Sequence, residues 1–477
     1  MQQPTRDSLS ATSSLSDRPA PLDRARAHSR APSVRSVTDR DGNELREVGG
    51  TGEQVPLDLV RPILCILSIL RCTLTVRPSP QLQSLYLNPL ASPTAADSPP
   101  PPAQHLRSPS LSSTSDRFSP HTVPGWPASV AFATRTTFPP VKKLARADRK
   151  RILVTGGAGF VGSHLVDRLM FLGHDVVVLD SFFSGNKTTL AHWVGHPNFE
   201  LIRGDVVEPI LLEVDQIYHL ACPASPKAYQ RNAVKTLKTS FIGTQNMLGL
   251  AKRTKARFLL SSTSEVYGSP TVHPQPESYW GNVNPNGPRA CYDEGKRVAE
   301  ALTYGYARQD GVDVRVARIF NCFGPRMSTD DGRLVSNFVV AALKGEPLQV
   351  YGDGQATRSL MFVHDLVTGL IDLMESSHSL TPVNIGSSDE GTVLSWAQTI
   401  LSTVRSLRAA GEIAPLPPAT PDRSEVEFVP AVVDDPPRRR PDTTLAREVI
   451  GWDPRWTVQA GLDETVRYFA AQLEMAD

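Results

Sequence analysis

Short apolar runs alternate with stretches of helical spacing from Arg149 to the end of the chain. The first run, Arg151–Thr155 (RILVT), stops at glycines, and apolar side chains at helical spacing follow over Phe160–Leu172. Uninterrupted apolar runs of this length are typical of strands that are buried on both faces of a sheet. Further runs of this kind are Val176–Asp180, Ile217–Ala221, Phe258–Ser261 and Val314–Ala317, and helical patterns are clearest at Ala233–Lys252 and Glu294–Arg308. Strands that alternate with helices pair in parallel through crossover helices, so the pattern predicts an α/β fold with a doubly wound parallel sheet of the Rossmann type.

Residues 1–148 lack this alternation and have a different composition. Prolines are crowded there, for example in Ser98–Pro102 (SPPPP), among many Ser, Ala and Arg residues. Such sequence cannot bury enough apolar area to offset the entropy lost on ordering it, which predicts a mostly disordered, low-complexity tail. The apolar stretch Ile63–Val76 interrupts this tail, but Arg71 divides it. A membrane-spanning helix needs about 20 apolar residues, so a short segment is favoured over a membrane anchor, and the cytoplasm is the expected location.

The net charge and the cysteine spacing argue against nucleic-acid binding, a disulfide scaffold and a metal site. The chain has 50 Lys and Arg against 49 Asp and Glu, and its net charge of +1 gives no global attraction to nucleic acid. Its five cysteines form no CxxC pair, and no cluster of Cys and His has the spacing of zinc ligands. We therefore expect no nucleic-acid partner, no disulfide scaffold and no metal site.

The loop between the first strand and the first helix is a candidate dinucleotide-binding loop. Gly156, Gly159 and Gly162 have GxxGxxG spacing in the segment TGGAGFVG. Glycines there permit a tight turn and a close backbone approach, so the helix N-terminus can face a pyrophosphate. Asp180 ends the second strand, where its carboxylate would bind the adenosine ribose hydroxyls and repel a 2′-phosphate, which favours NAD over NADP. The alternatives are a glycine turn used for structure alone and an Asp180 that only caps a turn.

A tyrosine, a lysine and a hydroxyl-rich turn supply candidate catalytic groups. Tyr292 and Lys296 are four residues apart, on one face of a predicted helix. Tyrosine, with a pKa near ~10, is a poor base at neutral pH, but an ammonium and a positive nicotinamide would stabilise its phenolate. Ser261–Gly268 (SSTSEVYG) follows a strand whose carboxyl end faces the ligand crevice, and Glu265 adds a carboxylate there. The structural alternatives are an exposed helix with a chance Tyr–Lys pair and a turn that caps a helix.

Together these residues resemble the extended short-chain dehydrogenase/reductase family, and within it the UDP-glucuronate decarboxylases. The resemblance runs from about Lys150 to the C-terminus. It rests on the stretches Thr155–His164, Asp205–Pro209, Arg289–Arg297 and Ala317–Met327. Ser264–Glu265 stands where the related 4,6-dehydratases have Asp-Glu, and 4-epimerases usually lack the glutamate. Arg438–Asp442 (RRRPD) is similar to the Arg-Lys-Pro-Asp type of segment of the decarboxylases, which makes Arg439 the active-site arginine.

The resemblance implies a catalytic domain at 149–477 that binds NAD mainly through 149–325 and a UDP-sugar mainly through the smaller C-terminal part, 326–477. It also implies a homodimer formed through paired helices. The implied catalytic residues are Tyr292, Lys296, Thr263, Glu265 and Arg439. The implied cofactor-binding residues are Gly156, Gly159, Phe160, Val161, Gly162, Asp180, Asp205, Val206, Tyr292 and Lys296. The implied substrate-binding residues are Pro223, Ser225, Asn321, Tyr351, Arg358 and Arg439.

The reaction implied by the resemblance is the decarboxylation of UDP-glucuronate to UDP-xylose. The C4 hydroxyl is oxidised by NAD, carbon dioxide leaves from the β-keto acid, and the same NADH reduces the 4-keto pentose. A UDP-sugar epimerase, a 4,6-dehydratase and a binding protein that senses NAD and UDP-sugar without turnover are the alternatives. Some relatives are anchored in the Golgi membrane with a lumenal catalytic domain, which is the alternative location.

Several positions depart from the family's usual residues. Ser240 stands where Asn is usual, Cys222 where Ser is usual, and Asn186 where Arg is common. Residues 405–433 are rich in Pro, Ala and acidic side chains, which predicts an inserted surface loop ahead of the arginine segment.

Overall fold

The computed structural model describes residues 138–475, apart from 380, 419, 432 and 433, together with the backbone of two short strands near the N-terminus. The chain divides into two compact units, Met1–Leu70 and Arg71–Asp477. In the first, β1 (Arg35–Thr38) pairs antiparallel with β2 (Glu44–Glu47). The apolar stretch at 63–76 and most of the predicted tail lie outside the described residues, so the predictions for them stay predictions.

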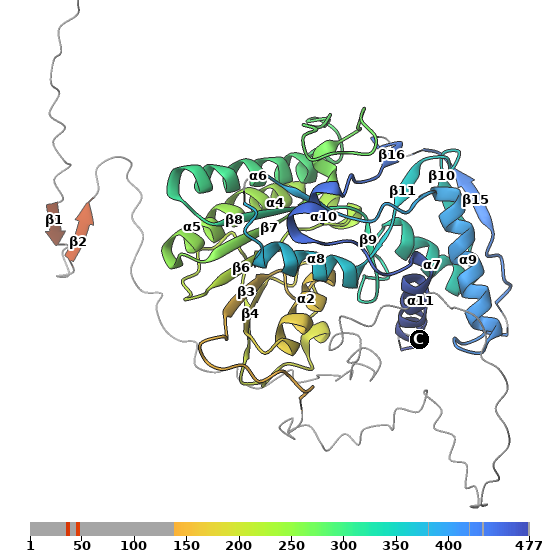
Figure 1. The fold of residues 1–477 in the computed structure, drawn as a ribbon, viewed down its shortest axis with the longest axis horizontal. Helices are drawn as coiled ribbons and strands as arrows, with labels where there is room; N and C mark the ends of the chain where they lie inside the picture. Colours follow the sequence, from red (N-terminus) through yellow and green to blue (C-terminus); the bar gives the residue numbers. More distant parts are fainter. Residues whose placement is uncertain are drawn as a thin grey trace, which may run out of the picture. The chain divides into compact units, whose positions relative to one another are not determined.

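A seven-stranded parallel sheet forms the centre of the second unit (Figure 1). Its strand order is β13-β8-β7-β6-β3-β4-β5, so the chain runs outward in both directions from the point between β3 and β6. The strands are β3 (Arg151–Thr155), β4 (Asp175–Asp180), β5 (Phe199–Arg203), β6 (Gln216–His219), β7 (Arg257–Thr263), β8 (Val314–Ile319) and β13 (Val383–Ile385). This order confirms the predicted doubly wound sheet. The hydrophobic pattern missed only the edge strands, because β5 is partly exposed and β13 has three residues.

Helices cover both faces of this sheet. Helices α5 and α6 pack against β6, β7 and β8 on one face, and α2 and α8 pack against β3, β4, β7 and β8 on the other. Their bounds are α2 (Phe160–Phe171), α3 (Pro226–Arg231), α4 (Ala233–Lys238), α5 (Thr244–Thr254), α6 (Ala290–Asp310) and α8 (Val363–Glu375). The helix predicted at 233–252 is α4 and α5 joined by a π-helical turn, Thr239–Gly243. Helix α6 begins four residues before its predicted start, at Ala290.

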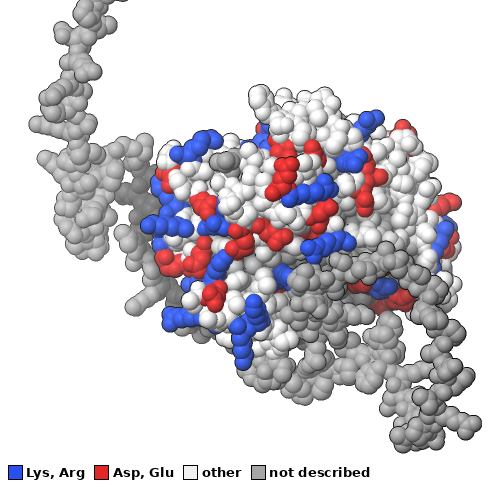
Figure 2. All heavy atoms as spheres, viewed as in Figure 1, with Lys and Arg blue, Asp and Glu red and all other residues white. Residues whose placement is uncertain are grey.

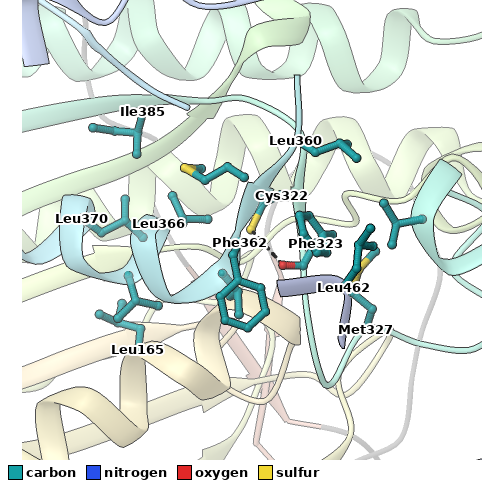
Figure 3. Packing of buried hydrophobic residues seen from close by; sticks show 14 of the residues in the cluster. Leu165, Cys322, Phe323, Met327, Leu360, Phe362, Leu366, Leu370, Ile385 and Leu462 are labelled. Atoms are coloured by element: carbon teal, nitrogen blue, oxygen red, sulfur yellow. Dashed lines mark hydrogen bonds between the residues drawn. The ribbon is translucent and has the colours of Figure 1, made fainter. Parts of the chain in front are cut away.

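Alternate side chains of each central strand belong to different hydrophobic clusters. Ile152 and Val154 pack into the larger cluster, whereas Leu153 between them packs into the other. Successive side chains of a strand point to opposite faces, and both faces are covered here, which explains the uninterrupted apolar run in the sequence. The larger cluster also joins the two parts of the domain, since Leu165 of α2 lies in the same packed group as Leu462 near the C-terminus (Figure 3).

The C-terminal part adds helices and three small sheets. Its helices are α7 (Leu334–Lys344), α9 (Val393–Ala409), α10 (Thr444–Ile450) and α11 (Val458–Glu474). Its strand pairs are β9 (Cys322–Phe323) with β12 (Met361–Phe362), β10 (Leu348–Tyr351) with β15 (Val426–Val429), and β11 (Thr357–Ser359) between β14 (Glu390–Thr392) and β16 (Arg438–Arg439). The loop predicted over 405–433 was therefore wrong in part, because this segment contains the end of α9 and all of β15. Strand β15 has four residues and pairs only with β10, so its alternation of apolar and polar residues is too short to recognise in the sequence.

The folded domain has a surface of mixed charge on one face, and its packing includes residues ahead of Arg149, the predicted start of the domain. On the face shown in Figure 2, basic and acidic side chains are interspersed. Phe138 lies edge-on to His196, and the Lys142 N–H donates to the Phe171 carbonyl, so residues ahead of Arg149 already contact the domain. Among the residues that the structure describes, no helix has the length and apolar character that a membrane crossing requires.

Candidate functional site

A cleft of about 1020 Å³ lies where the central strands end. Its lining includes residues at or just after the carboxyl ends of β3, β4, β6, β7 and β8, which is the edge at which doubly wound sheets bind ligands. Every residue that the sequence predicted for cofactor binding, substrate binding or catalysis lines this one cleft. The fold thus brings together residues that lie between positions 156 and 439 of the sequence.

The glycine loop leaves no room for side chains. A Cβ atom on Gly162 would lie 2.2 Å from the Gly156 carbonyl oxygen, and one on Gly156 would lie 2.9 Å from Cα of Ala221. Gly156 also has a φ of +70°, which favours glycine. The backbone therefore packs on itself, while the first turn of α2 at Phe160 and Val161 borders the cleft. These observations fit a pyrophosphate at this helix N-terminus.

A buried histidine fixes the strand that leads into this loop. Nδ1 of His219 is 2.8 Å from the Thr155 hydroxyl, and Nε2 is 3.1 Å from the Thr244 hydroxyl. The Thr155 hydroxyl in turn accepts a hydrogen bond from the Ala221 N–H at 3.2 Å. Burial and the positive charge of Lys296 lower the pKa of His219 to about 3. The ring is therefore neutral at physiological pH and ties β3, β6 and α5 together below the cleft.

Asp180 is held at the end of β4 by two backbone groups. Its carboxylate accepts from the Ala158 N–H at 2.9 Å and from the Phe182 N–H at 2.8 Å. Burial raises the pKa of Asp180, whereas these two hydrogen bonds act to lower it. The chain passes close by, because a Cβ atom on Gly185 would lie 3.0 Å from Oδ1. A fixed carboxylate beside the glycine loop fits the ribose of an adenine dinucleotide.

Tyr292 lies in the cleft between a stacked tyrosine and a lysine. Its ring stacks on Tyr229, with centroids 5.2 Å apart and planes inclined by 10°. The Lys296 ammonium is 5.9 Å from the Tyr292 ring centroid and donates to the Ser261 carbonyl at 2.7 Å. Burial raises the pKa of Tyr292, and a hydrogen bond with the Thr263 hydroxyl only partly opposes this. The protein's own groups therefore do not bring this pKa down, so the expected activation needs positive charge from outside the chain.

Glu265 is the centre of a buried ion cluster. Arg439 donates to both its oxygens, at 2.8 and 2.9 Å, and Arg289 contacts one of them at 2.5 Å. Burial acts to raise the pKa of Glu265, but Arg439 and then Arg289 hold it below its ordinary value. The carboxylate is therefore ionised at neutral pH, with one guanidinium bound in a bidentate geometry.

The C-terminal part places a second arginine next to this cluster. The parallel pairing of β11 with β16 sets Arg358 opposite Arg439. Arg358 is buried and donates to Asp435 at 2.8 Å, while the Trp396 indole N–H donates to the Arg358 carbonyl at 2.9 Å. Tyr351, which is 46% exposed, also lines the cleft.

Other predicted residues have partners within the protein. The Asn321 side-chain amide donates to the Ser359 carbonyl at 3.4 Å. The Ser225 hydroxyl accepts from the Ala228 N–H at 3.3 Å and caps α3. Asp205 forms an ion pair with Lys235. The remaining cleft residues of the prediction are Gly159, Val206 and Pro223.

Arg289, Asp435 and Tyr229 also line the cleft, although the sequence did not predict them as members of the site. Arg289 stands inside a stretch that carried the resemblance, but nothing in the linear sequence pairs it with Glu265. The structure also relates two departures from the family pattern, because Cys222 Sγ lies 3.4 Å from Ser240 Oγ. The described residues contain no group of three or more His, Cys, Asp or Glu placed to hold a metal ion.

Comparison with known proteins assigns the chain to a class. Residues 153–465 match the family model described as GDP-mannose 4,6 dehydratase. The chain therefore belongs to this family of extended short-chain dehydrogenases/reductases.

More particular similarities lie within that class. UDP-glucuronic acid decarboxylase 1 from Danio rerio is 58% identical over 337 residues, which cover 71% of this chain and 77% of that protein. UDP-glucuronic acid decarboxylase 4 from Arabidopsis thaliana is 57% identical over 319 residues, 67% of this chain and 68% of that protein. These relatives confirm the resemblance to UDP-glucuronate decarboxylases.

Solved structures of other members share the fold. A UDP-glucose 4-epimerase from Thermotoga maritima, determined with UDP-glucose, superposes with a TM-score of 0.59 at 28% identity and covers 68% of this chain and 99% of that one. A dTDP-glucose 4,6-dehydratase from Streptomyces venezuelae, with NAD bound, gives a TM-score of 0.59 at 28% identity, covering 68% of this chain and 98% of that one.

Proposed function

We propose that this chain decarboxylates UDP-glucuronate to UDP-xylose, with NAD as a cofactor that is used and regenerated in each cycle. The observation that carries this proposal is the buried pairing of Glu265 with Arg439 beside Tyr292. This arrangement places Tyr292, the proposed base for oxidation at C4 of the sugar, beside an arginine and a carboxylate that could act at its C6 carboxylate. The two relatives described above, at 57–58% identity, support the same reaction.

The residues of the cleft fit NAD. Its pyrophosphate would be held at the glycine loop and its adenosine ribose at Asp180, with Asp205 and Val206 further along the cleft. The chemistry that NAD supplies when bound is the reversible acceptance of a hydride. Tyr292 and Lys296 line the same cleft as the glycine loop. The group that would take the proton of the substrate hydroxyl and the cofactor that would take its hydride can therefore lie at the same substrate carbon.

Tyr292 is proposed to remove the proton of the C4 hydroxyl through its phenolic oxygen. Because burial raises the pKa of Tyr292, the side chain keeps its own proton until positive charge enters the cleft. Lys296 is anchored on the Ser261 carbonyl, which fixes its ammonium near the tyrosine ring. Thr263, hydrogen-bonded with Tyr292, holds the phenolic oxygen in place and completes the pair of hydroxyls at the substrate oxygen.

The loss of carbon dioxide follows from the position of the ketone. A 4-ketone is β to the C6 carboxylate, so cleavage leaves an enolate whose negative oxygen needs hydrogen-bond donors. Thr263 and Tyr292 are the proposed donors, and preorganised donors of this kind stabilise such charge strongly. Arg439 and Glu265 are proposed to orient the carboxylate, or a water molecule, for decarboxylation and reprotonation at C5.

The test is to incubate the purified chain with UDP-glucuronate and NAD⁺. Sugar anomeric signals are followed by NMR, and carbon dioxide is measured in parallel. UDP-xylose with stoichiometric carbon dioxide is expected. A changed six-carbon sugar without carbon dioxide would refute decarboxylation in favour of an epimerase or dehydratase, and binding without any product would favour a sensor.

We also propose a homodimer formed through α4 and α6. These helices pack together, and with the π-helical turn they expose large apolar side chains: Val234 at 63%, Leu237 at 41%, Phe241 at 43% and Val298 at 36%. Apolar side chains gathered in this way mark interaction surfaces. The variant Val234→Glu should shift light-scattering mass from dimer to monomer, whereas Leu211→Glu, at a separate position that is 80% exposed, should not. A monomeric unmodified chain at micromolar concentration would contradict the proposal.

The cytoplasmic location predicted from the sequence stays a prediction. The Golgi alternative does so too, because the stretch at 63–76 on which it depends lies outside the described residues.

A further inference from the structure

Three of the arginines that line the cleft, Arg289, Arg358 and Arg439, are paired with two carboxylates of the chain itself. Arg439 and Arg289 contact Glu265, whereas Arg358 contacts Asp435. Asp435 also lies 4.0 Å from Arg289, so it stands between two guanidinium groups. All five side chains border the cleft. An anionic ligand that enters must therefore compete with a carboxylate that is already in place.

The two carboxylates differ in how easily they can give up their arginines. The Glu265 side chain is 12% exposed, and Arg439 binds both its oxygens. Separating a buried pair leaves an uncompensated charge, which is strongly unfavourable. The Asp435 side chain is 38% exposed and makes one short contact, to Arg358 at 2.8 Å. The Asp435 carboxylate can therefore move into water at low cost, whereas the Arg358 side chain is 8% exposed and needs another anion in its place.

We propose that Asp435 is a placeholder for an anionic group of the nucleotide sugar. It pairs with Arg358 and approaches Arg289 before the ligand arrives, and it releases these guanidinium groups to the ligand. Two groups of a UDP-sugar acid share the required chemistry, the diphosphate and the sugar carboxylate. The inference rests on the proposed function only in that the ligand is a nucleoside diphosphate sugar.

The neighbouring residue provides a matched control. Asp434 contacts no arginine among the described ion pairs; its carboxylate accepts from the Asn284 side-chain amide at 2.9 Å. Asp434 has a φ of +62°, a conformation that asparagine tolerates well. The variants Asp434→Asn and Asp435→Asn therefore change the net charge equally, but only the second removes the charge that competes for Arg358.

The test is calorimetric titration of the full chain and both variants with UDP, UDP-glucose and UDP-glucuronate. For Asp435→Asn we expect binding that is about two- to fivefold tighter, because the carboxylate that competes for Arg358 is gone and its end of the pair is accessible to solvent. A gain for all three ligands identifies the diphosphate as the displacing group, and a gain for UDP-glucuronate alone identifies the sugar carboxylate. Both outcomes support the proposal.

Unchanged or weaker binding by Asp435→Asn would overturn it, and so would an equal gain in Asp434→Asn. Weaker binding would mean that Asp435 holds Arg358 in its ligand-binding position. Because the titration needs no turnover, its result is separate from that of the decarboxylation assay.

Discussion

Replacing Arg439 by methionine should destabilise the protein strongly at neutral pH. The change removes the bidentate partner of Glu265, whose carboxylate is buried and ionised. Breaking a buried pair by removing one partner costs about 3–5 kcal/mol. Arg289 remains 2.5 Å from Glu265, so we expect the lower end, about 3 kcal/mol. The neighbouring Arg438 is exposed, and Arg438→Met serves as the matched control with an expected change below about 0.5 kcal/mol.

The stability lost in Arg439→Met should depend on pH, because it comes from the pairing of an ionised carboxylate. The pKa of Glu265 is lowered in the folded state, so its pairing contributes stability above the pKa of the unfolded chain. This contribution is lost as the pH falls through the lowered folded pKa. The difference between the unmodified protein and Arg439→Met should therefore be full at pH 7 and shrink as the solution becomes acidic below about pH 4.

The measurement is urea unfolding at pH 7 and at a series of lower pH values. The double variant Glu265→Gln with Arg439→Met should recover part of the loss, because it removes the buried carboxylate that Arg439→Met leaves with Arg289 alone. If Arg439→Met were as stable as Arg438→Met at pH 7, Glu265 could not be the buried, ionised partner described above. A stability difference that stays constant with pH would refute the electrostatic reasoning.

Two further predictions concern the cofactor and the base. The variant Tyr292→Phe should keep NAD affinity within about twofold and lose nearly all turnover, because only the phenolic oxygen is removed; appreciable turnover would exclude Tyr292 as the base. The variant Gly162→Ala should abolish NAD binding in a fluorescence titration, since the new Cβ would lie 2.2 Å from the Gly156 oxygen. Gly249→Ala, where no atom lies within 4 Å of the added Cβ, should bind NAD normally and be slightly more stable.

The sequence predicted the centre of the fold well because the central strands are covered on both faces. The RILVT run and its counterparts are apolar throughout for that reason, and each coincides with a strand of the sheet. The hydrophobic pattern failed at the edges of sheets, where β5 is partly exposed and β15 is short. The predicted single helix at 233–252 also contains a π-helical turn, which leaves the spacing of apolar positions nearly unchanged.

The site was predicted as a set of residues, but its electrostatics were not. Glu265 and Arg439 are 174 positions apart, so only the resemblance could suggest that they meet. Arg289 was missed because an arginine before a helix has no signature of its own. The burial that raises the pKa of Tyr292 was not predicted, because spacing along a helix reveals the nearby lysine but not the degree of burial.

The shared hydrophobic cluster has a consequence for how members of this class can diversify. Leu165 of α2 packs in one core with Phe323, Phe362 and Leu462 from much later in the chain (Figure 3). Grafting the C-terminal segment of another member onto this chain would replace one side of that core and leave mismatched volumes, which close-packed interiors tolerate poorly. New sugar specificities should therefore arise by substitution of individual cleft residues rather than by recombination of whole segments.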